Sequence, residues 1–113
     1  MPFCVRKCPY CDFYSLPSET GETELYSGYA KAVVRNLRHY RERFGTVYFG
    51  GGTPNLIAGY MEEILSAADI AAGAEISAEC NPASTGRDAL RAMRGAGINR
   101  ISVGVQSLQD EEL

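Results

Sequence analysis

Apolar residues recur with helical spacing between Thr20 and Arg43, the first regular pattern in the chain. The positions on this face are Leu25, Tyr29, Val33, Leu37 and Tyr40. Residues three and four apart lie on one side of an α-helix, so the spacing predicts an amphipathic helix. Glu22 and Glu24 fall in its first turn, where the helix dipole favours negative charge.

Strand and helix patterns then alternate to the end of the chain. The predicted strands are 46–49, 75–80 and 100–106, and the predicted helices between them are 58–71 and 85–95. Gly73 and Gly97 stand where these two helices should end, and Thr85 is a candidate N-cap. Repeated helix–strand units of this length build parallel sheets with right-handed crossovers. The sequence therefore predicts an α/β fold, an incomplete parallel (βα) barrel with three αβ units over residues 20–113.

Alternation within the last two strands divides their side chains between two faces. The apolar face, which can cover the helices, carries Ile76, Ala78, Cys80, Ile101, Val103 and Val105. The opposite face carries Ser77, Glu79, Ser102, Gly104 and Gln106. Parallel strands are usually apolar on both faces, because both are covered. The polar face therefore predicts a barrel lumen that binds a polar ligand.

Composition limits the protein to one small globular domain. Of its 113 residues 45% are hydrophobic and 22% are charged, which excludes a disordered or low-complexity chain. Eleven basic against fourteen acidic residues give a net charge of −3, which argues against nucleic acid as a partner. No apolar run reaches the roughly 18 residues of a membrane span, and there is no export signal. We expect a cytoplasmic protein without a membrane span.

Three of the four cysteines lie close together in residues 1–19, which have no helix or strand period and are expected to form a loop. Cys4, Cys8 and Cys11 form a C-x3-C-x2-C pattern. Structural zinc sites usually have four ligands, whereas three thiolates suit a [4Fe-4S] cluster with one open iron. The pattern favours an iron–sulfur cluster over zinc or an unligated redox-active set. Cys80 is expected to be a buried apolar filler rather than a fourth ligand.

Other candidate positions have two interpretations each. The glycine run at 50–54 follows a strand, where it can approach a ligand closely or simply make a tight turn. Glu79 and Gln106 lie near strand ends and are either ion-pair partners or ligand contacts. Tyr10 can shield a cluster or stack on a flat ring. The single histidine, His39, lies in a charged stretch and is expected to be solvated.

Four segments, in this order, resemble radical S-adenosylmethionine proteins of the oxygen-independent coproporphyrinogen III oxidase group. They are PFCVRKCPYCDF at 2–13, VYFGGGTP at 47–54, ECNP at 79–82 and NRISVGVQS at 99–107. The resemblance covers nearly the whole chain and implies the N-terminal part of a partial (βα)6 barrel. Cys80 stands where the family usually has alanine, a small change that we do not expect to alter function.

The resemblance also implies a role for each candidate site residue. Cys4, Cys8 and Cys11 would bind three irons of a [4Fe-4S] cluster, and S-adenosylmethionine would chelate the fourth. Gly51, Gly52 and Thr53 match the segment that holds the methionine amino end. Tyr10 matches an aromatic position near the adenine, and Glu79 and Gln106 match polar contacts to S-adenosylmethionine. In this family the reduced cluster gives one electron to the sulfonium and releases a 5′-deoxyadenosyl radical.

Two branches of the group share these motifs. Asp12 and Phe13 follow the third cysteine here, as in the heme chaperone branch, whereas the coproporphyrinogen dehydrogenase branch has a further cysteine shortly downstream. The resemblance therefore favours heme binding and transfer, with porphyrinogen oxidation as the alternative. A non-catalytic iron–sulfur module is the third possibility.

Members of the group begin with a strand before the cysteine loop and continue well beyond Leu113. We therefore expect this chain to be an N-terminal fragment that is inactive alone. In the whole protein the implied partners are S-adenosylmethionine, heme or a porphyrinogen, and a reductant protein.

Overall fold

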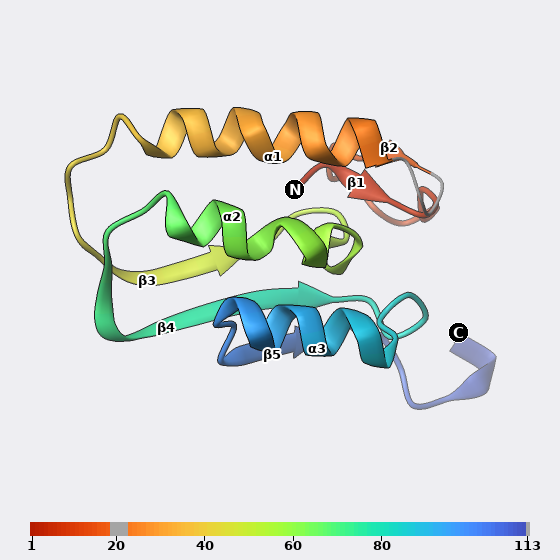
Figure 1. The fold of residues 1–113 in the computed structure, drawn as a ribbon. Coiled ribbons are helices and arrows are strands. Elements are labelled where there is room, and N and C mark those ends of the chain that lie inside the picture. Colours follow the sequence, from red (N-terminus) through yellow and green to blue (C-terminus); the bar gives the residue numbers. More distant parts are fainter. Residues whose placement is uncertain (19–22, 113) are drawn as a thin grey trace.

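The computed structural model describes residues 1–18 and 23–112, and helices and strands alternate along these parts of the chain (Figure 1). The main sheet contains β3 (Phe44–Phe49), β4 (Ile70–Cys80) and β5 (Arg100–Val103), all parallel and in the order β3-β4-β5. The helices are α1 (Thr23–Leu37), α2 (Met61–Ser66) and α3 (Arg87–Ala96), with 3-10 helices η1 (Pro54–Tyr60) and η2 (Asp110–Glu112). The predicted α/β class with parallel strands is confirmed. Within the described residues, no helix is long and apolar enough to cross a membrane.

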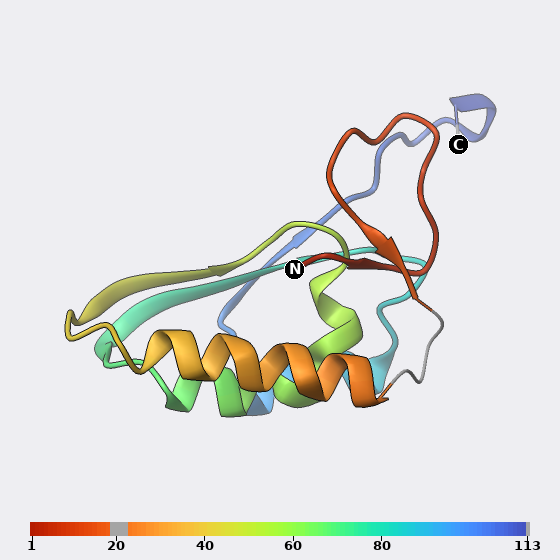
Figure 2. The same ribbon diagram turned by 90° about the horizontal axis from the view of Figure 1, so that it is seen from above.

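The helices cover one face of the sheet and leave the other face open (Figure 2). The core between helices and sheet includes Ala30, Val34, Phe49, Ile57, Met61, Ile64, Ala78, Cys80, Met93 and Ile98. Burial of Ala78 and Cys80 in this core confirms the predicted helix-facing side of β4. Ile101 is aligned with Ala78 and so shares its face, because in-register neighbours point the same way. Ile101 and Val103 nevertheless stay half-exposed on the outer strand of the described sheet.

The first helix is shorter than its sequence pattern predicts. It ends at Leu37 rather than near Arg43, and the positions predicted at Thr20 and Glu22 lie outside the described residues. The last backbone bonds tighten to the 3-10 type, with the Tyr40 amide donating to the Leu37 carbonyl at 3.0 Å. The Tyr40 ring then packs against Phe44, with ring centres 6.4 Å apart. Tyr40 therefore contacts the start of β3 rather than extending the helical face.

The second predicted helix, 58–71, is replaced by η1 followed by the six-residue α2. The strand after it begins at Ile70, so Gly73 is wrong as a helix cap and lies inside β4. The pairing explains this: Phe44 aligns with Ile70 but Thr46 aligns with Glu75, so β4 contains a bulge. Gly73 has a φ of 78° there, a conformation that glycine adopts without a steric penalty.

The third helix and the last strand also differ at their ends. Gly86, not Thr85, is the N-cap of α3, because the Thr85 hydroxyl donates to the Asn81 carbonyl at 2.6 Å instead. Gly97 ends the helix with a φ of 106°, as predicted. Strand β5 ends at Val103 rather than at Gln106.

The predicted loop, residues 1–19, contains strands within its described part, residues 1–18, which corrects the sequence interpretation. Two short parallel strands, β1 (Phe3–Cys4) and β2 (Leu16–Pro17), bring the two ends of the cysteine loop together. The Phe3 side chain is 1% exposed, and its ring centre lies 4.9 Å from that of Tyr26 and 5.1 Å from that of Tyr29. The start of the loop is therefore fixed on helix α1 by aromatic packing.

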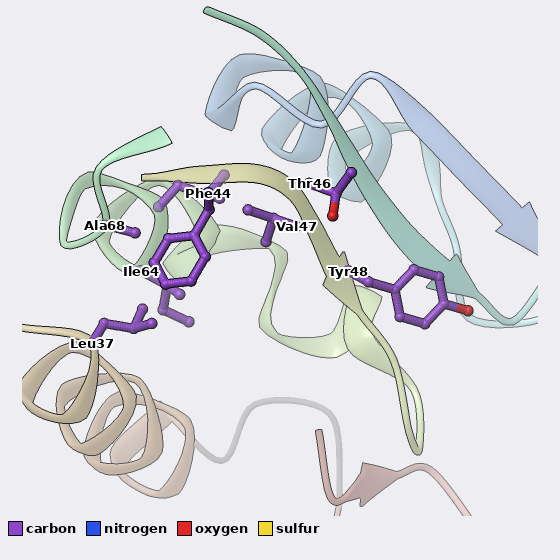
Figure 3. Close-up of a pocket in the computed structure, with 8 residues that line it drawn as sticks. Leu37, Phe44, Thr46, Val47, Tyr48, Ile64 and Ala68 are labelled. Atoms are coloured by element: carbon purple, nitrogen blue, oxygen red, sulfur yellow. The ribbon is translucent and has the colours of Figure 1, made fainter. Parts of the chain in front are cut away.

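An apolar cavity of about 220 Å³ opens beside β3 (Figure 3). Its lining includes Leu37, Phe44, Val47, Ile64 and Ala68. It lies between α1, α2 and the outer edge of β3, and its lining has no titratable side chain except the Tyr48 phenol. It therefore belongs to the packing of the layers and offers little chemistry.

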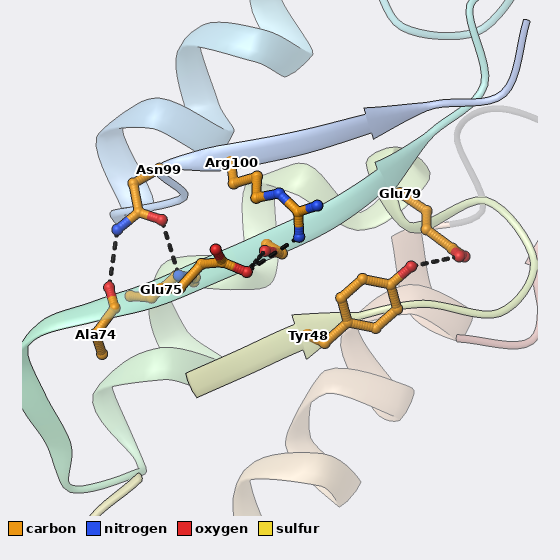
Figure 4. Close-up of polar contacts among 8 residues, drawn as sticks. Tyr48, Ala74, Glu75, Glu79, Asn99 and Arg100 are labelled. Carbon is orange, nitrogen blue, oxygen red and sulfur yellow. Dashed lines mark hydrogen bonds and ion pairs between the residues drawn. The ribbon is translucent and has the colours of Figure 1, made fainter. Parts of the chain in front are cut away.

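Asn99 joins β4 to β5 through its side chain as well as its backbone (Figure 4). Its Oδ1 accepts from the Ile76 amide at 2.8 Å, and its Nδ2 donates to the Ala74 carbonyl at 2.8 Å. Its own amide donates to the Ile76 carbonyl at 2.9 Å. Asn99 thus extends the β4–β5 ladder by side-chain bonds just before β5 begins.

We expect Asn99→Ala to lower the free energy of unfolding by about 1–2 kcal/mol, because it leaves two backbone groups of β4 without partners. Urea unfolding of both chains measures this difference. Asn36→Ala is the matched control, since Asn36 lies on the exposed side of α1 and its change should stay within about 0.5 kcal/mol. Equal effects of the two substitutions would contradict this role of Asn99.

Candidate functional site

The glycine loop, residues 50–53, leaves the carboxyl end of β3 and is bonded to the start of the chain. The Met1 nitrogen donates to the Gly50 carbonyl at 2.6 Å. In return, the Gly52 amide donates to the Met1 carbonyl and the Thr53 amide to the Phe3 carbonyl, each at 2.6 Å. The glycine loop and the segment that leads to Cys4 are therefore one hydrogen-bonded unit at the end of the sheet where parallel folds bind ligands.

Two glycines of this loop are required by close contacts within the chain. Gly51 has a φ of 113°, and a Cβ there would lie 2.5 Å from the Met1 carbonyl oxygen. A Cβ at Gly52 would overlap the Phe3 carbonyl oxygen and lie 3.0 Å from the Cys4 Sγ. The sequence analysis expected these glycines to admit a ligand or a turn. In the structure they admit the cysteine-bearing segment.

The amides of Gly51, Gly52 and Thr53 in this loop are engaged by the protein itself. Gly51 donates to the Glu79 carboxylate at 2.9 Å, and Gly52 and Thr53 donate to the residue 1–3 segment as described above. Among the described residues, the carbonyl oxygens of Gly51 and Gly52 accept no backbone hydrogen bond. A phosphate-binding glycine loop needs free N–H groups. This loop instead presents acceptors, which suit a cationic donor such as an ammonium group.

The three clustered cysteines lie on one loop and are each partly exposed as free thiols. A turn links two of them, with the Cys11 amide donating to the Cys8 carbonyl at 3.1 Å, and the Thr53 hydroxyl donates to the Cys4 Sγ at 3.6 Å. Within residues 1–18 and 23–112, no three His, Cys, Asp or Glu side chains are gathered closely enough to hold a metal. Three free thiols on one accessible loop are nevertheless the donor set that an iron–sulfur cluster uses, so these residues fit that group.

Cys80 differs from the other cysteines in its environment. Its side chain is 4% exposed within the core, and burial raises the pKa of its thiol, with a smaller opposite effect from the Thr85 hydroxyl. A thiol that resists ionisation is a poor metal ligand. The environment of Cys80 therefore agrees with its interpretation as an apolar filler.

Aromatic side chains line the cysteine loop. Tyr10 is exposed, and its hydrogen bond with Cys8 raises the pKa of its phenol. Phe13 and Tyr14 are also exposed and border an open cavity of about 430 Å³ beside Gly51. Sequence analysis used Phe13 only to separate family branches and missed Tyr14. Three aromatic residues within five positions of the cysteine loop were the signal that could have predicted an apolar wall there.

Glu79 lies on the open face of the sheet, as the alternation predicts. It accepts a hydrogen bond from the Tyr48 hydroxyl to Oε1 at 2.6 Å (Figure 4). Its Oε2 accepts a second one from the Gly51 amide at 2.9 Å. The hydrogen bond to Glu79 raises the pKa of the Tyr48 phenol. Glu79 is therefore brought to the glycine loop by direct contact, and Tyr48 is a site residue that sequence analysis missed.

A second polar group lies on the same face, toward the start of β5. Ser77 donates to Glu75 Oε1 at 2.8 Å, and the Arg100 guanidinium lies 3.1 Å from the same oxygen. The Ser77 hydrogen bond and then Arg100 lower the pKa of the Glu75 carboxyl. The open face thus carries the Glu75–Arg100 ion pair and, further along β4, the Glu79 carboxylate, in agreement with the predicted polar face.

Gln106 is not brought to Glu79 by any contact that the described residues make. Because β5 ends at Val103, strand alternation no longer determines where its side chain points. Gln106 has a φ of 69°, and a Cβ added at Gly104 would lie 2.9 Å from its Nε2. Its side chain therefore folds back over Gly104.

His39 agrees with its interpretation as a solvated residue. It is exposed after the end of α1, and its Nδ1 lies 2.8 Å from the Arg35 carbonyl oxygen.

Comparison with known proteins establishes the class of this protein. The chain matches the family described as the Radical SAM superfamily over residues 1–113, and it belongs to that superfamily. It is 35% identical over 121 residues to the heme chaperone HemW of Escherichia coli (strain K12), covering 100% of this chain and 32% of the relative. It is 40% identical over 131 residues to HemW of Synechocystis sp., covering 100% of this chain and 30% of the relative.

Further relatives include a mitochondrial protein and a solved structure. Radical S-adenosyl methionine domain-containing protein 1 of Bos taurus is 37% identical over 119 residues, covering 99% of this chain and 27% of the relative. The structure of coproporphyrinogen III oxidase (HemN) from Escherichia coli, a radical SAM enzyme, superposes with a TM-score of 0.78 at 28% identity. That match covers 98% of this chain and 27% of the enzyme, and it confirms the partial barrel fold. The chain spans about a third of the length of the curated relatives it matches.

We expect Gly52→Ala to displace residues 1–4, because the new methyl group would overlap the Phe3 carbonyl and crowd the Cys4 sulfur. The free energy of unfolding should fall by about 1–3 kcal/mol. Cys4 should also react faster with a thiol reagent, measured by mass spectrometry of the labelled peptide.

Gly95→Ala is the control for this substitution. Gly95 lies within α3 and has nothing within 4 Å of an added Cβ, so alanine should be neutral or stabilising by up to about 1 kcal/mol. Unchanged Cys4 reactivity in Gly52→Ala would show that the glycine loop does not hold the cysteine segment.

Proposed function

We propose that this chain forms the cofactor-binding part of a radical SAM heme chaperone that holds a [4Fe-4S] cluster and S-adenosylmethionine. One observation carries the cofactor part of the proposal: the glycine loop is bonded to the cysteine-bearing segment and presents carbonyl oxygens rather than amides. The amino end of S-adenosylmethionine is a cationic donor, so it matches those acceptors. A ligand held there lies next to the loop that carries the thiols.

Each candidate site residue has a separate role in this proposal. Cys4, Cys8 and Cys11 would bind three irons, and Gly51, Gly52 and Thr53 would hold the amino end of S-adenosylmethionine. Tyr10 would lie near the adenine, and Glu79 and Gln106 would supply polar contacts. When bound, the cluster would supply one electron to the sulfonium of S-adenosylmethionine. The whole protein would therefore need a reductant protein that reduces the cluster.

Two features of this chain support this assignment of roles. The Thr53 hydroxyl donates to the Cys4 Sγ, and a hydrogen bond to a ligand sulfur helps to set the potential of an iron–sulfur cluster. The fixed pairing of residues 1–3 with the glycine loop sets the distance between the thiols and the ammonium site. The open polar face of the sheet leaves room for the rest of the molecule.

Heme binding and transfer by the whole protein is supported by the relatives. The HemW proteins at 32–40% identity are described as heme chaperones, and Asp12 and Phe13 follow the third cysteine as in that branch. The second candidate is oxidation of coproporphyrinogen III, which the TM-score of 0.78 to HemN favours. Both candidates use the same cofactor residues, so the structure of this part serves either function.

Anaerobic reconstitution with iron and sulfide tests the cluster ligands. In the protein expressed from the complete reading frame, Cys4→Ala, Cys8→Ala and Cys11→Ala should each abolish the broad visible absorption of an oxygen-labile cluster. Cys80→Ala is the matched control and should retain it, because Cys80 is buried in the core. A cluster that survives Cys11→Ala but not Cys80→Ala would contradict the assignment.

Parallel assays on the same protein separate the two candidate functions. We expect heme titration to give saturable binding seen in the Soret band, and reduced protein with S-adenosylmethionine to leave coproporphyrinogen III unchanged. Decarboxylated product, lost in Cys8→Ala, together with no saturable heme binding would instead establish the second candidate.

A further inference from the structure

Tyr48 stands next to the end of β3 with its ring over the glycine loop. A Cβ added at Gly50 would lie 2.6 Å from the Tyr48 Cε1 and 3.4 Å from the Glu79 Oε2. A side chain at Gly50 would therefore displace the Tyr48 ring from its present position and would lie in ordinary contact with the Glu79 carboxylate. The ring is largely exposed on the open face, yet its hydroxyl is directed to one acceptor, Glu79 Oε1, at 2.6 Å.

The Glu79 carboxylate joins three pieces of backbone through two oxygens. It extends from β4, accepts from the phenol of a β3 residue, and accepts from the amide of Gly51 in the loop. The Tyr48 hydroxyl and the Gly51 amide bind different oxygens, so neither competes with the other. With Oε1 fixed by the phenol, rotation of the carboxylate is restricted and Oε2 remains directed at the Gly51 amide.

We propose that Tyr48 is a positioning residue of the cofactor site that acts through Glu79 on the glycine loop. Its hydroxyl orients the carboxylate, and the carboxylate fixes the Gly51 amide and with it the 50–51 peptide at the start of the glycine loop. The conformation of the loop that carries the Gly51 and Gly52 carbonyl oxygens thereby depends on Tyr48. Glu79 is then primarily a holder of the loop. The effect of Tyr48 on S-adenosylmethionine rests on the proposed function, whereas its effect on the loop does not.

The loop arm of the test uses NMR of the 113-residue chain and the substitution Tyr48→Phe, which removes one oxygen and keeps the ring. Amide exchange at Gly51 should accelerate about fivefold to tenfold, because a charge-assisted hydrogen bond that holds its acceptor is lost. The chemical shift of the Gly51 amide should also change, because the position of its acceptor changes. Glu79→Gln should accelerate exchange at Gly51 as well, because the amide then loses its charged acceptor.

Tyr40→Phe is the matched control, since Tyr40 is an exposed tyrosine at the opposite end of β3. It should leave both Gly51 readouts unchanged. If Tyr48→Phe also leaves the exchange rate and the chemical shift of the Gly51 amide unchanged, the inference is overturned.

The ligand arm measures S-adenosylmethionine affinity by calorimetry in the reconstituted protein from the complete reading frame. Tyr48→Phe should weaken binding roughly threefold to tenfold, and Tyr40→Phe should not. Equal affinity of Tyr48→Phe and the unsubstituted protein would overturn the role of Tyr48 in the cofactor site. Absence of binding in the unsubstituted protein would refute the proposed function, while the response of Gly51 in the first arm would still support positioning of the loop.

Discussion

The docking of residues 1–3 on the glycine loop is the interaction on which the arrangement of this site depends. Two backbone amide hydrogen bonds and one from the Met1 amino group, each of 2.6 Å, join two segments about fifty residues apart in the sequence. They form only if no side chain intervenes, so Gly51 and Gly52 have little freedom to change. Aromatic packing of Phe3 on α1 holds the same segment from the other side. The position of Cys4 is therefore determined by the backbone of β3 and by the helix layer together.

The layer arrangement could be predicted from the sequence because it follows from side-chain period alone. Burial of Ala78 and Cys80 against the helices places Glu79 on the open face, whatever the strand boundaries are. Boundaries were harder to predict because they depend on pairing between distant residues. The bulge around Gly73 arises from the register of β4 against Phe44 and Thr46, which no local pattern contains.

In the candidate site, too, features within one continuous segment could be predicted, whereas contacts between distant residues could not. The cysteine spacing and the glycine run could be read directly, since each is a continuous segment. The role of Tyr48 could not, because its partner Glu79 is 31 residues away and β3 looks like an ordinary β-branched and aromatic strand. For Gln106, the predicted strand was too long. The sequence pattern extends the strand to residue 106, whereas β5 ends at Val103, so alternation does not determine where the Gln106 side chain points.

The hydrogen bonds of the loop amides also limit the kind of ligand that this glycine run could bind. Glycine loops bind phosphates when their N–H groups are free, and a dipole or a basic residue then adds to the attraction. Here the amides of Gly51, Gly52 and Thr53 are used by Glu79 and by residues 1–3. The negative charge of Glu79 beside the loop further disfavours an anion and favours a cation. The hydrogen bonds that hold the loop are thus also the ones that make it a poor site for an anion.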